Sequence, residues 1–230
     1  MRVVIFGATG MVGQGVLREC LRDRDVTHVL AVGRRPTGVT DSRLAELVRR
    51  DLFDWSDAAG VLTGYDACFF CLGVSAAGMS EADYTRTTYD LTLAAATALA
   101  RLNPGMTFIY VSGQGTDSSM TGRAMWARVK GRTENALLGL PFRAAYMFRP
   151  GMIQPVEGVR PSNAVYRAFY AVMGPVMPLL RRLFPTQIVT TAEVGRAMLR
   201  VARHGYPHPV LERGDIAGCA RSHPLPARTN

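Results

Sequence analysis

The stretch that decides the fold is RVVIFGATGMVG, residues 2–13. Residues 2–7 form a continuous β-rich apolar run, which is typical of a strand buried on both faces. Gly7, Gly10 and Gly13 follow at intervals of three, and apolar residues at helical spacing begin within the same motif. The stretch therefore predicts a strand, a tight glycine turn and the start of a helix in immediate succession.

A strand, a glycine turn and a helix in this order suit the pyrophosphate of a dinucleotide. Glycine allows the backbone to approach the phosphates closely, and the helix N-terminus offers free N–H groups and the positive end of its dipole. The spacing GxxGxxG differs from GxGxxG, and the absence of GxxxxGK[ST] excludes a triphosphatase P-loop. A glycine turn without a ligand is the alternative. The expected contact residues of the turn are Gly7, Thr9, Gly10, Met11 and Gly13.

The rest of the chain repeats the alternation of strand and helix. Strand-like runs cover residues 27–33, 44–51, 65–73, 106–113 and 142–151, with helical patterns around 80–102 and over 124–140. This rhythm predicts an α/β fold, a Rossmann-type doubly wound parallel sheet with helices on both faces. A further helix is expected over 192–205 and a short last strand at 209–212.

The sequence pattern changes after Pro150, and the expected domain organisation follows from this change. We expect one NAD(P)-binding domain over residues 1–212, with a small C-terminal helical substrate lobe mainly over 151–190. Residues 213–230 are expected to form a flexible tail. The aromatic and methionine-rich stretch 164–184 either lines an apolar pocket or packs as ordinary helix.

Composition narrows the class of protein. The chain of 230 residues is 48% hydrophobic and 20% charged, as in a globular domain. No apolar run is long enough to span a bilayer. The four cysteines show no framework spacing, so we expect reduced thiols and a cytoplasmic location. The four histidines lack metal-ligand spacing, and no metal site is expected.

The formal net charge of +9 raises the question of a polyanionic partner. The arginines are spread in ones and twos, so we expect no nucleic-acid binding, although positive potential helps to capture a small anion. Arginines among apolar residues in 161–184 leave open a peripheral membrane contact through that segment.

The second predicted strand ends in AVGRRP, where this fold reads the adenosine ribose. An acid there accepts from a free 2′-hydroxyl, whereas Arg34 and Arg35 suit a 2′-phosphate. One charge-assisted hydrogen bond contributes about 1.5–3 kcal/mol, which corresponds to roughly ten- to hundredfold preference for NADP(H) over NAD(H). Two solvated surface arginines are the alternative. Other expected cofactor contacts follow the third and fourth strands: Asp51, Leu52, Cys71, Leu72 and Gly73.

Five motifs in this order resemble the short-chain dehydrogenase/reductase superfamily, and within it the atypical NAD-dependent epimerase/dehydratase-like branch. They are GATGMVG, CLG after the fourth strand, YVSG at the fifth, a lysine in the next helix, and RPG at 149–151. The resemblance covers about residues 1–212. It implies a catalytic serine after the fifth strand, matched by Ser112, and a Tyr-x-x-x-Lys whose lysine is matched by Lys130.

Lys130 is the one lysine among 27 basic residues. The resemblance implies that its ammonium holds the hydroxyls of the nicotinamide ribose. A compact point charge fits between ribose oxygens where a planar guanidinium does not. Survival of one lysine by chance in an arginine-rich chain is the alternative.

Trp126 stands where the superfamily has its catalytic tyrosine. Indole has one N–H donor and no proton that ionises at accessible pH, so it cannot act as the acid or base. Three accounts remain open. Ser112 or a water relays the proton, another group such as Tyr84 or Tyr110 substitutes, or the site binds the dinucleotide without turnover.

The sequence therefore predicts an NADP(H)-binding oxidoreductase or epimerase-like enzyme acting on a small, fairly apolar carbonyl or hydroxyl compound. The alternative is a non-catalytic NADP(H) sensor or assembly factor, which the Trp126 substitution favours. The resemblance also leaves a homodimer open, because pairing through two helices per subunit is common in the superfamily.

Overall fold

The computed structural model describes residues 1–156 and 188–221. Its centre is a seven-stranded sheet in the order β3-β2-β1-β4-β5-β6-β9, and every neighbouring pair is parallel. The predicted α/β fold with a doubly wound parallel sheet is confirmed. The strands are β1 Arg2–Phe6, β2 His28–Gly33, β3 Leu44–Val48, β4 Ala67–Phe70, β5 Thr107–Val111, β6 Ala144–Arg149 and β9 Val210–Glu212.

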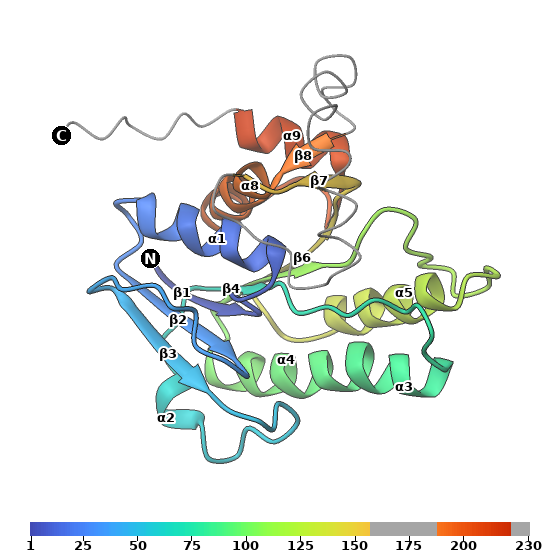
Figure 1. The fold of residues 1–230 in the computed structure, drawn as a ribbon, viewed down its shortest axis with the longest axis horizontal. Coiled ribbons are helices and arrows are strands. Elements are labelled where there is room, and N and C mark those ends of the chain that lie inside the picture. Colours follow the sequence, from blue (N-terminus) through green and yellow to red (C-terminus); the bar gives the residue numbers. More distant parts are fainter. Residues whose placement is uncertain (157–187, 222–230) are drawn as a thin grey trace.

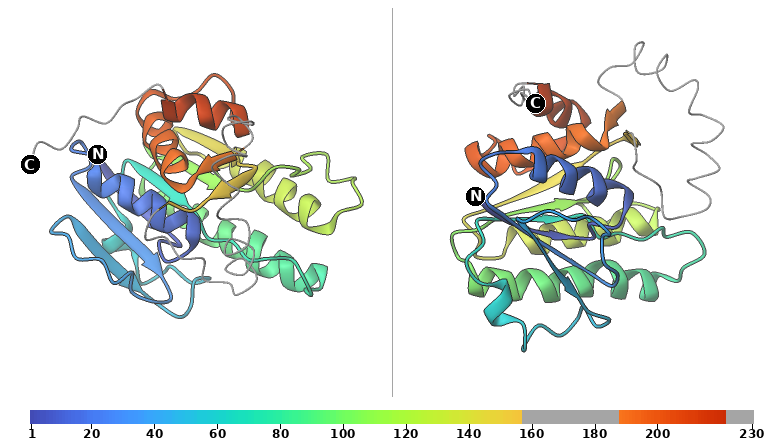
Figure 2. Two further views of the ribbon diagram at one scale, coloured as in Figure 1. Left: turned by 45° about the horizontal axis from the view of Figure 1, so that its top comes forward. Right: turned by 60° about the vertical axis from the view of Figure 1, so that its left-hand side comes forward.

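Helices cover both faces of this sheet, and each face has its own core (Figure 1). One core is formed with α1 Met11–Arg22, α8 Thr191–His204 and α9 Arg213–Arg221. The other is formed with α2 Ala59–Leu62, α4 Leu91–Leu102 and α5 Met125–Leu138. The views in Figure 2 show α1 beside α8, although they come from opposite ends of the chain.

The strand order reverses at β1, and this reversal positions the site. From β1 the chain builds outward through β2 and β3, and then crosses back to β4 on the other side. Phe6 is paired with both Val32 and Phe70, so the three strands end at one level. The segments that follow them diverge there, and ligands of open α/β sheets bind at such a switch point.

The helix expected around 80–102 consists of three consecutive segments. A short α3 Glu81–Thr85 leads into a π-helical turn η1 Arg86–Asp90 and then into α4. Thr88 lies buried in this turn. Such π-turns insert an extra residue into a helix and are common near functional sites.

The C-terminal region differs from the expectation in two ways. Residues 213–221 form α9, whose apolar residues pack against α8, so the expected flexible tail does not begin at residue 213. A second small sheet joins β7 Met152–Gln154 to β8 Ile188–Thr190. Most of the expected substrate lobe lies outside the described residues, and so does the stretch 161–184, for which a membrane contact was left open. No helix in the described part is long and apolar enough to cross a membrane.

Helix α8 begins at a capping box and packs closely on α1. The Thr190 side chain accepts from the Glu193 backbone N–H, and the Glu193 carboxylate accepts from the Thr190 N–H at 2.7 Å. A Cβ added at Gly15 of α1 would lie 2.4 Å from the Thr191 side chain. The absence of a side chain at Gly15 therefore lets the two helices approach closely, and this packing holds α1, the helix that follows the glycine turn, in place.

Candidate dinucleotide site

The glycine turn is held tightly by its own backbone. Gly7 has a φ of +80°, and a Cβ there would lie 2.9 Å from the Leu72 backbone nitrogen. A Cβ at Gly13 would lie 2.1 Å from the Gly7 carbonyl oxygen. Gly10 donates its N–H to the same carbonyl at 2.9 Å. The turn is thus folded against residues 71–72 after β4, at the switch point of the sheet.

The entrance to α1 has the features of an anion site. Gly10 is the N-cap residue and makes no side-chain cap, and no acidic residue lies in the first turn from Met11. A Cβ at Gly10 would meet only the Gly7 oxygen, at 3.3 Å. The first N–H groups of the helix are therefore neither capped by their N-cap side chain nor opposed by a carboxylate, and these residues fit a pyrophosphate. The Thr9 carbonyl accepts from the Gln14 side chain, which steadies the turn.

The structure brings Ser112 and Lys130 together across β5 and α5. The Lys130 ammonium donates to the Ser112 carbonyl oxygen. Ser112 is buried, and its hydroxyl donates to the Phe148 carbonyl of β6 at 3.1 Å. Lys130 is therefore at the carboxyl edge of the sheet, while the Ser112 hydroxyl is turned into the backbone of the neighbouring strand.

Burial changes the acidity of Lys130. Desolvation lowers the pKa of the Lys130 ammonium to about 8, and the charge of Glu134 opposes that shift. The Lys130 ammonium therefore loses its proton at a pH only slightly above neutral. The other 26 of the 27 lysine and arginine residues are arginines, which keep their charge. Lys130 is therefore the one member of this group that can lose its charge near neutral pH.

The loop after β5 lies directly on α5 and explains further glycines. Gly113 and Gly115 have φ values of +133° and +85°. A Cβ at Gly115 would lie 3.3 Å from the Trp126 ring, and one at Gly131 would lie 1.8 Å from the Asp117 carbonyl oxygen. The glycine after Lys130 is thus needed for packing, a role that the sequence analysis missed because the contact comes from outside the helix.

Trp126 is half-buried on α5 beside this loop, four residues before Lys130. Two proposed substitutes for the missing tyrosine are removed by the structure. Tyr84 and Tyr110 are each 1% exposed, and burial raises the pKa of both phenols. Tyr110 belongs to the core on the α4 side of the sheet and Tyr84 is covered by its neighbours, so neither phenol is exposed where a substrate can reach it.

The arginine of the RPG motif is fully engaged. Its guanidinium donates to both carboxylate oxygens of Glu134, to Ser118 Oγ at 2.5 Å and to Glu212 at 3.2 Å. These contacts join the ends of β6 and β9 to α5 and to the loop after β5. Arg149 therefore stabilises the floor of the site rather than reaching for a substrate.

Arg34 and Arg35 are exposed after β2. Arg35 lines a small cavity with Thr9 of the glycine turn. The same cavity contains Thr37 and Glu46, and Glu46 is an acid that the sequence analysis missed. No local pattern marked it, because only the pairing of β3 with β2 brings it into one cavity with Arg35.

The remaining predicted cofactor residues take up different positions. Asp51 is exposed, and its carboxylate accepts from the Phe53 N–H, whereas Leu52 is buried in the core. Burial raises the pKa of the Cys71 thiol to about 12, so it is not a thiolate near neutral pH. Leu72 contacts the glycine turn through its backbone, and Gly73 is exposed.

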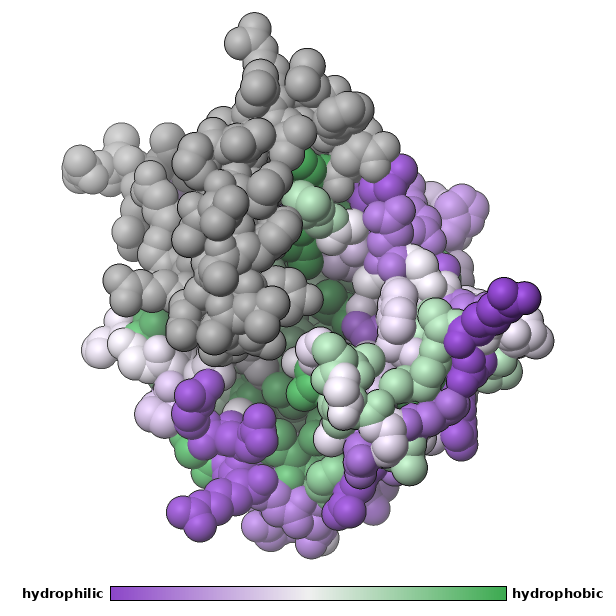
Figure 3. Space-filling view, turned by 45° about the vertical axis from the view of Figure 1, so that its right-hand side comes forward, coloured by the Kyte–Doolittle hydropathy of each residue, from purple (hydrophilic) through white to green (hydrophobic). Residues whose placement is uncertain are grey.

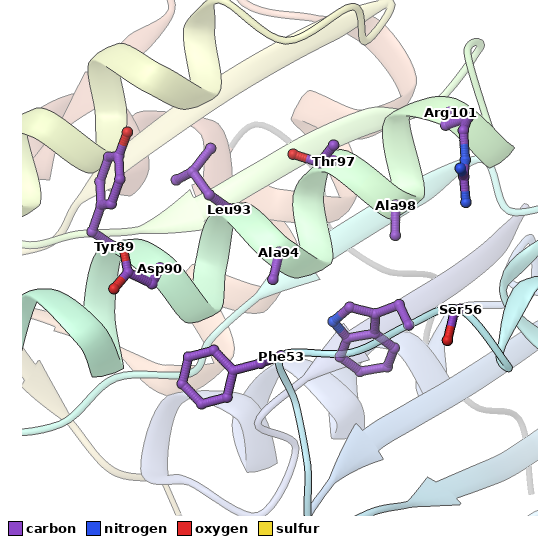
Figure 4. Close-up of a pocket in the computed structure, with 10 residues that line it drawn as sticks. Phe53, Ser56, Tyr89, Asp90, Leu93, Ala94, Thr97, Ala98 and Arg101 are labelled. Carbon is purple, nitrogen blue, oxygen red and sulfur yellow. The ribbon is translucent and has the colours of Figure 1, made fainter.

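A wider groove of about 680 Å³ lies on the outer side of α4 and is not part of this site. Figure 4 shows Leu93, Ala94 and Thr97 on one wall and Phe53 on the other. None of the glycine-turn residues and none of Ser112, Trp126 and Lys130 line it. Figure 3 views the molecule from another side and shows apolar residues gathered in a hollow of the surface, with polar residues beside it.

The fold and this arrangement define a nicotinamide-dinucleotide-binding protein of the short-chain dehydrogenase/reductase type. The chain belongs to the NAD(P)H-binding family, which matches residues 7–137. It is 30% identical over 187 residues to the mitochondrial protein fmp52 of Emericella nidulans, covering 78% of each chain. It is 27% identical over 172 residues to protein HTATIP2 of Rattus norvegicus, covering 73% of this chain and 69% of the other.

A solved structure shows the same fold. A UDP-N-acetylglucosamine 4-epimerase from Methanobrevibacter ruminantium superposes with a TM-score of 0.66 at 16% identity, covering 92% of this chain and 75% of the epimerase. The family match and the relatives, together with this shared fold, confirm the resemblance to the superfamily. The relatives correct one prediction. Five of them, including that of Emericella nidulans, are named as mitochondrial proteins, so the cytoplasmic prediction is wrong.

Proposed function

We propose that this protein is an NADP(H)-dependent oxidoreductase or epimerase-like enzyme acting on a small, fairly apolar carbonyl or hydroxyl compound. The observation that carries the proposal is the hydrogen bond from the Lys130 ammonium to the Ser112 carbonyl at the carboxyl edge of the sheet. Ser112 follows β5, and the glycine turn follows β1, so the two lie on opposite sides of β4. A nicotinamide held there would supply or accept the hydride. Arg34 and Arg35 support a preference for the 2′-phosphate of NADP(H).

The side chains have separate roles in this proposal. The turn from Gly7 to Gly13 binds the pyrophosphate, and Lys130 donates to the nicotinamide ribose. Ser112 Oγ, after rotating away from the Phe148 carbonyl, donates to the reacting oxygen of the substrate. Trp126 shapes the pocket, and a water relays the proton because the indole cannot.

Nucleotide binding can be measured through Trp126. We expect NADPH to quench tryptophan emission by energy transfer with a dissociation constant in the micromolar range, and NADH to bind more weakly. Trp55 is the other indole in the chain, so Trp126→Phe assigns the signal. Trp55 itself is buried, with its N–H on the Leu52 carbonyl. Absence of quenching by both nucleotides, with no binding by calorimetry, contradicts the proposal.

Turnover separates an enzyme from a sensor. With a panel of small apolar aldehydes and ketones, we expect Ser112→Ala to lower kcat/KM about a hundredfold, while NADPH affinity stays within about twofold. Trp126→Tyr restores the missing acid, and we expect it to raise kcat at least about tenfold, with Trp126→Phe as the control.

The second candidate is a non-catalytic NADP(H) sensor, favoured by Trp126 in place of the tyrosine. A sensor binds NADPH but consumes none with any compound of the panel, in the wild-type protein and in Trp126→Tyr alike. Binding without consumption assigns the sensor and rejects the enzyme, because both candidates keep their NADPH affinity in Ser112→Ala.

A further inference from the structure

Glu46 brings an acid to the end of the sheet where the adenosine ribose is read. It lies on β3, paired with Ala31 of β2, and two residues before the Val48–Gly33 pair. With Thr9 from the glycine turn and Arg35 from the end of β2, it lines one small cavity. Residues of opposite charge, Glu46 and Arg35, therefore line the same cavity.

The Glu46 carboxylate is held in place by one neighbour. Its Oε1 atom accepts from the Thr37 N–H at 2.7 Å and from the Thr37 hydroxyl at 2.5 Å. Among the described residues, the other oxygen, Oε2, has no hydrogen-bond partner, and no ion pair joins Glu46 to Arg35. One oxygen thus fixes the loop after β2, and the second is left to interact with a ligand.

The size of the cavity limits what it can receive. It holds about 10 Å³, which is room for roughly one water molecule. A single oxygen-bearing group fits there, whereas a whole ribose is too large to enter. A hydroxyl donates to a carboxylate, but a phosphate carries about −1.5 to −2 charge and is repelled by it.

We infer that Glu46 is a specificity-determining residue that accepts a hydrogen bond from the ribose of NAD(H) and disfavours the 2′-phosphate of NADP(H). It opposes Arg34 and Arg35, so the affinities of the protein for the two dinucleotides lie within about tenfold of each other. This inference rests on the proposed nucleotide site and deepens it. The earlier expectation of up to hundredfold preference took account of the arginines alone.

The test is Glu46→Gln, which removes the charge and keeps an oxygen that accepts from Thr37. Dissociation constants are measured for NADPH and NADH, and for the fragments 2′,5′-ADP and 5′-AMP, which differ only in the 2′-phosphate. Removing one negative charge near a phosphate at a protein surface strengthens its binding by about fivefold. With the lost hydroxyl acceptor, we expect the ratio of the NADH to the NADPH constant to rise about tenfold.

One further variant makes the result specific. Glu81→Gln makes the same chemical change on α3, where Glu81 pairs with Arg128 and does not line the cavity. We expect the ratio to stay within twofold of wild type in this variant.

The outcomes are distinguishable. If both nucleotides bind and Glu46→Gln leaves the ratio unchanged, the inference is wrong and the proposed function stands. An equal shift in Glu81→Gln also overturns it, because net charge alone then explains the effect. If the wild-type protein binds none of the four probes, the proposed function fails, and the inference fails with it.

Discussion

Replacement of Gly13 by alanine is expected to abolish measurable dinucleotide binding and to destabilise the fold. The added Cβ would lie 2.1 Å from the Gly7 carbonyl oxygen and 2.9 Å from the Ala8 Cα, and both are backbone atoms that cannot move aside alone. Forcing extra volume into a packed region costs about 1–3 kcal/mol, and more where the backbone must shift. Equilibrium urea unfolding and NADPH titration measure the two effects.

Gly60→Ala is the matched control for this substitution. Gly60 lies in α2 with no heavy atom within 4 Å of the added Cβ. Alanine favours a helix over glycine by about 1 kcal/mol, so we expect an unchanged or slightly higher free energy of unfolding. Gly13→Ala with wild-type NADPH affinity would show that the turn does not hold the pyrophosphate.

Replacement of Lys130 by methionine is expected to lower NADPH affinity at least about 30-fold, the equivalent of about 2 kcal/mol for lost charge-assisted hydrogen bonds. Methionine is similar in length and suits a buried position, so the free energy of unfolding at pH 7 should fall little. Lys130→Arg keeps the charge but introduces a planar group, and we expect it to bind NADPH no better than the methionine variant. Wild-type affinity in Lys130→Arg would mean that charge alone suffices.

The same side chain predicts opposite pH trends for binding and stability. The ammonium is present below its folded pKa of about 8, so NADPH affinity is highest there and falls up to about tenfold between pH 8 and 9. In the unfolded chain this lysine has its ordinary pKa of about 10.5. The unfolded state therefore binds more protons between pH 8 and 10.5, and the Lys130 contribution to stability rises with pH through that window. Both trends disappear in Lys130→Met, which is the comparison to measure.

Local sequence was enough to predict the parts of the site that depend on neighbouring residues. The strand, glycine turn and helix over 2–13 are dictated by apolar pattern and glycine spacing, and β9 followed from the short run at 209–212. Lys130 was identified by its rarity and its place after Ser112, and the structure joins the two.

Features that arise from distant contacts were missed. Helix α9 contains Gly214 and Gly218, which lower its intrinsic helix propensity, and packing of Ile216 and Cys219 in the core compensates. Glu46 gave no signal because its role depends on the pairing of β3 with β2. The burial of Tyr110 beneath α5 was likewise a matter of tertiary packing.

The close packing of α1 on α8 has a consequence for biosynthesis. Gly195 of α8 leaves room for Glu19, and Arg196 pairs with that buried carboxylate at 3.4 Å. The helix that presents the phosphate turn leaves the ribosome well before the helix that covers it. A growing chain therefore carries the apolar face of α1 and the Glu19 carboxylate without their partner until residues 191–204 have been made. We expect chaperones to bind the chain during that interval. We also expect nucleotide affinity to appear only after residue 204 has emerged from the ribosome.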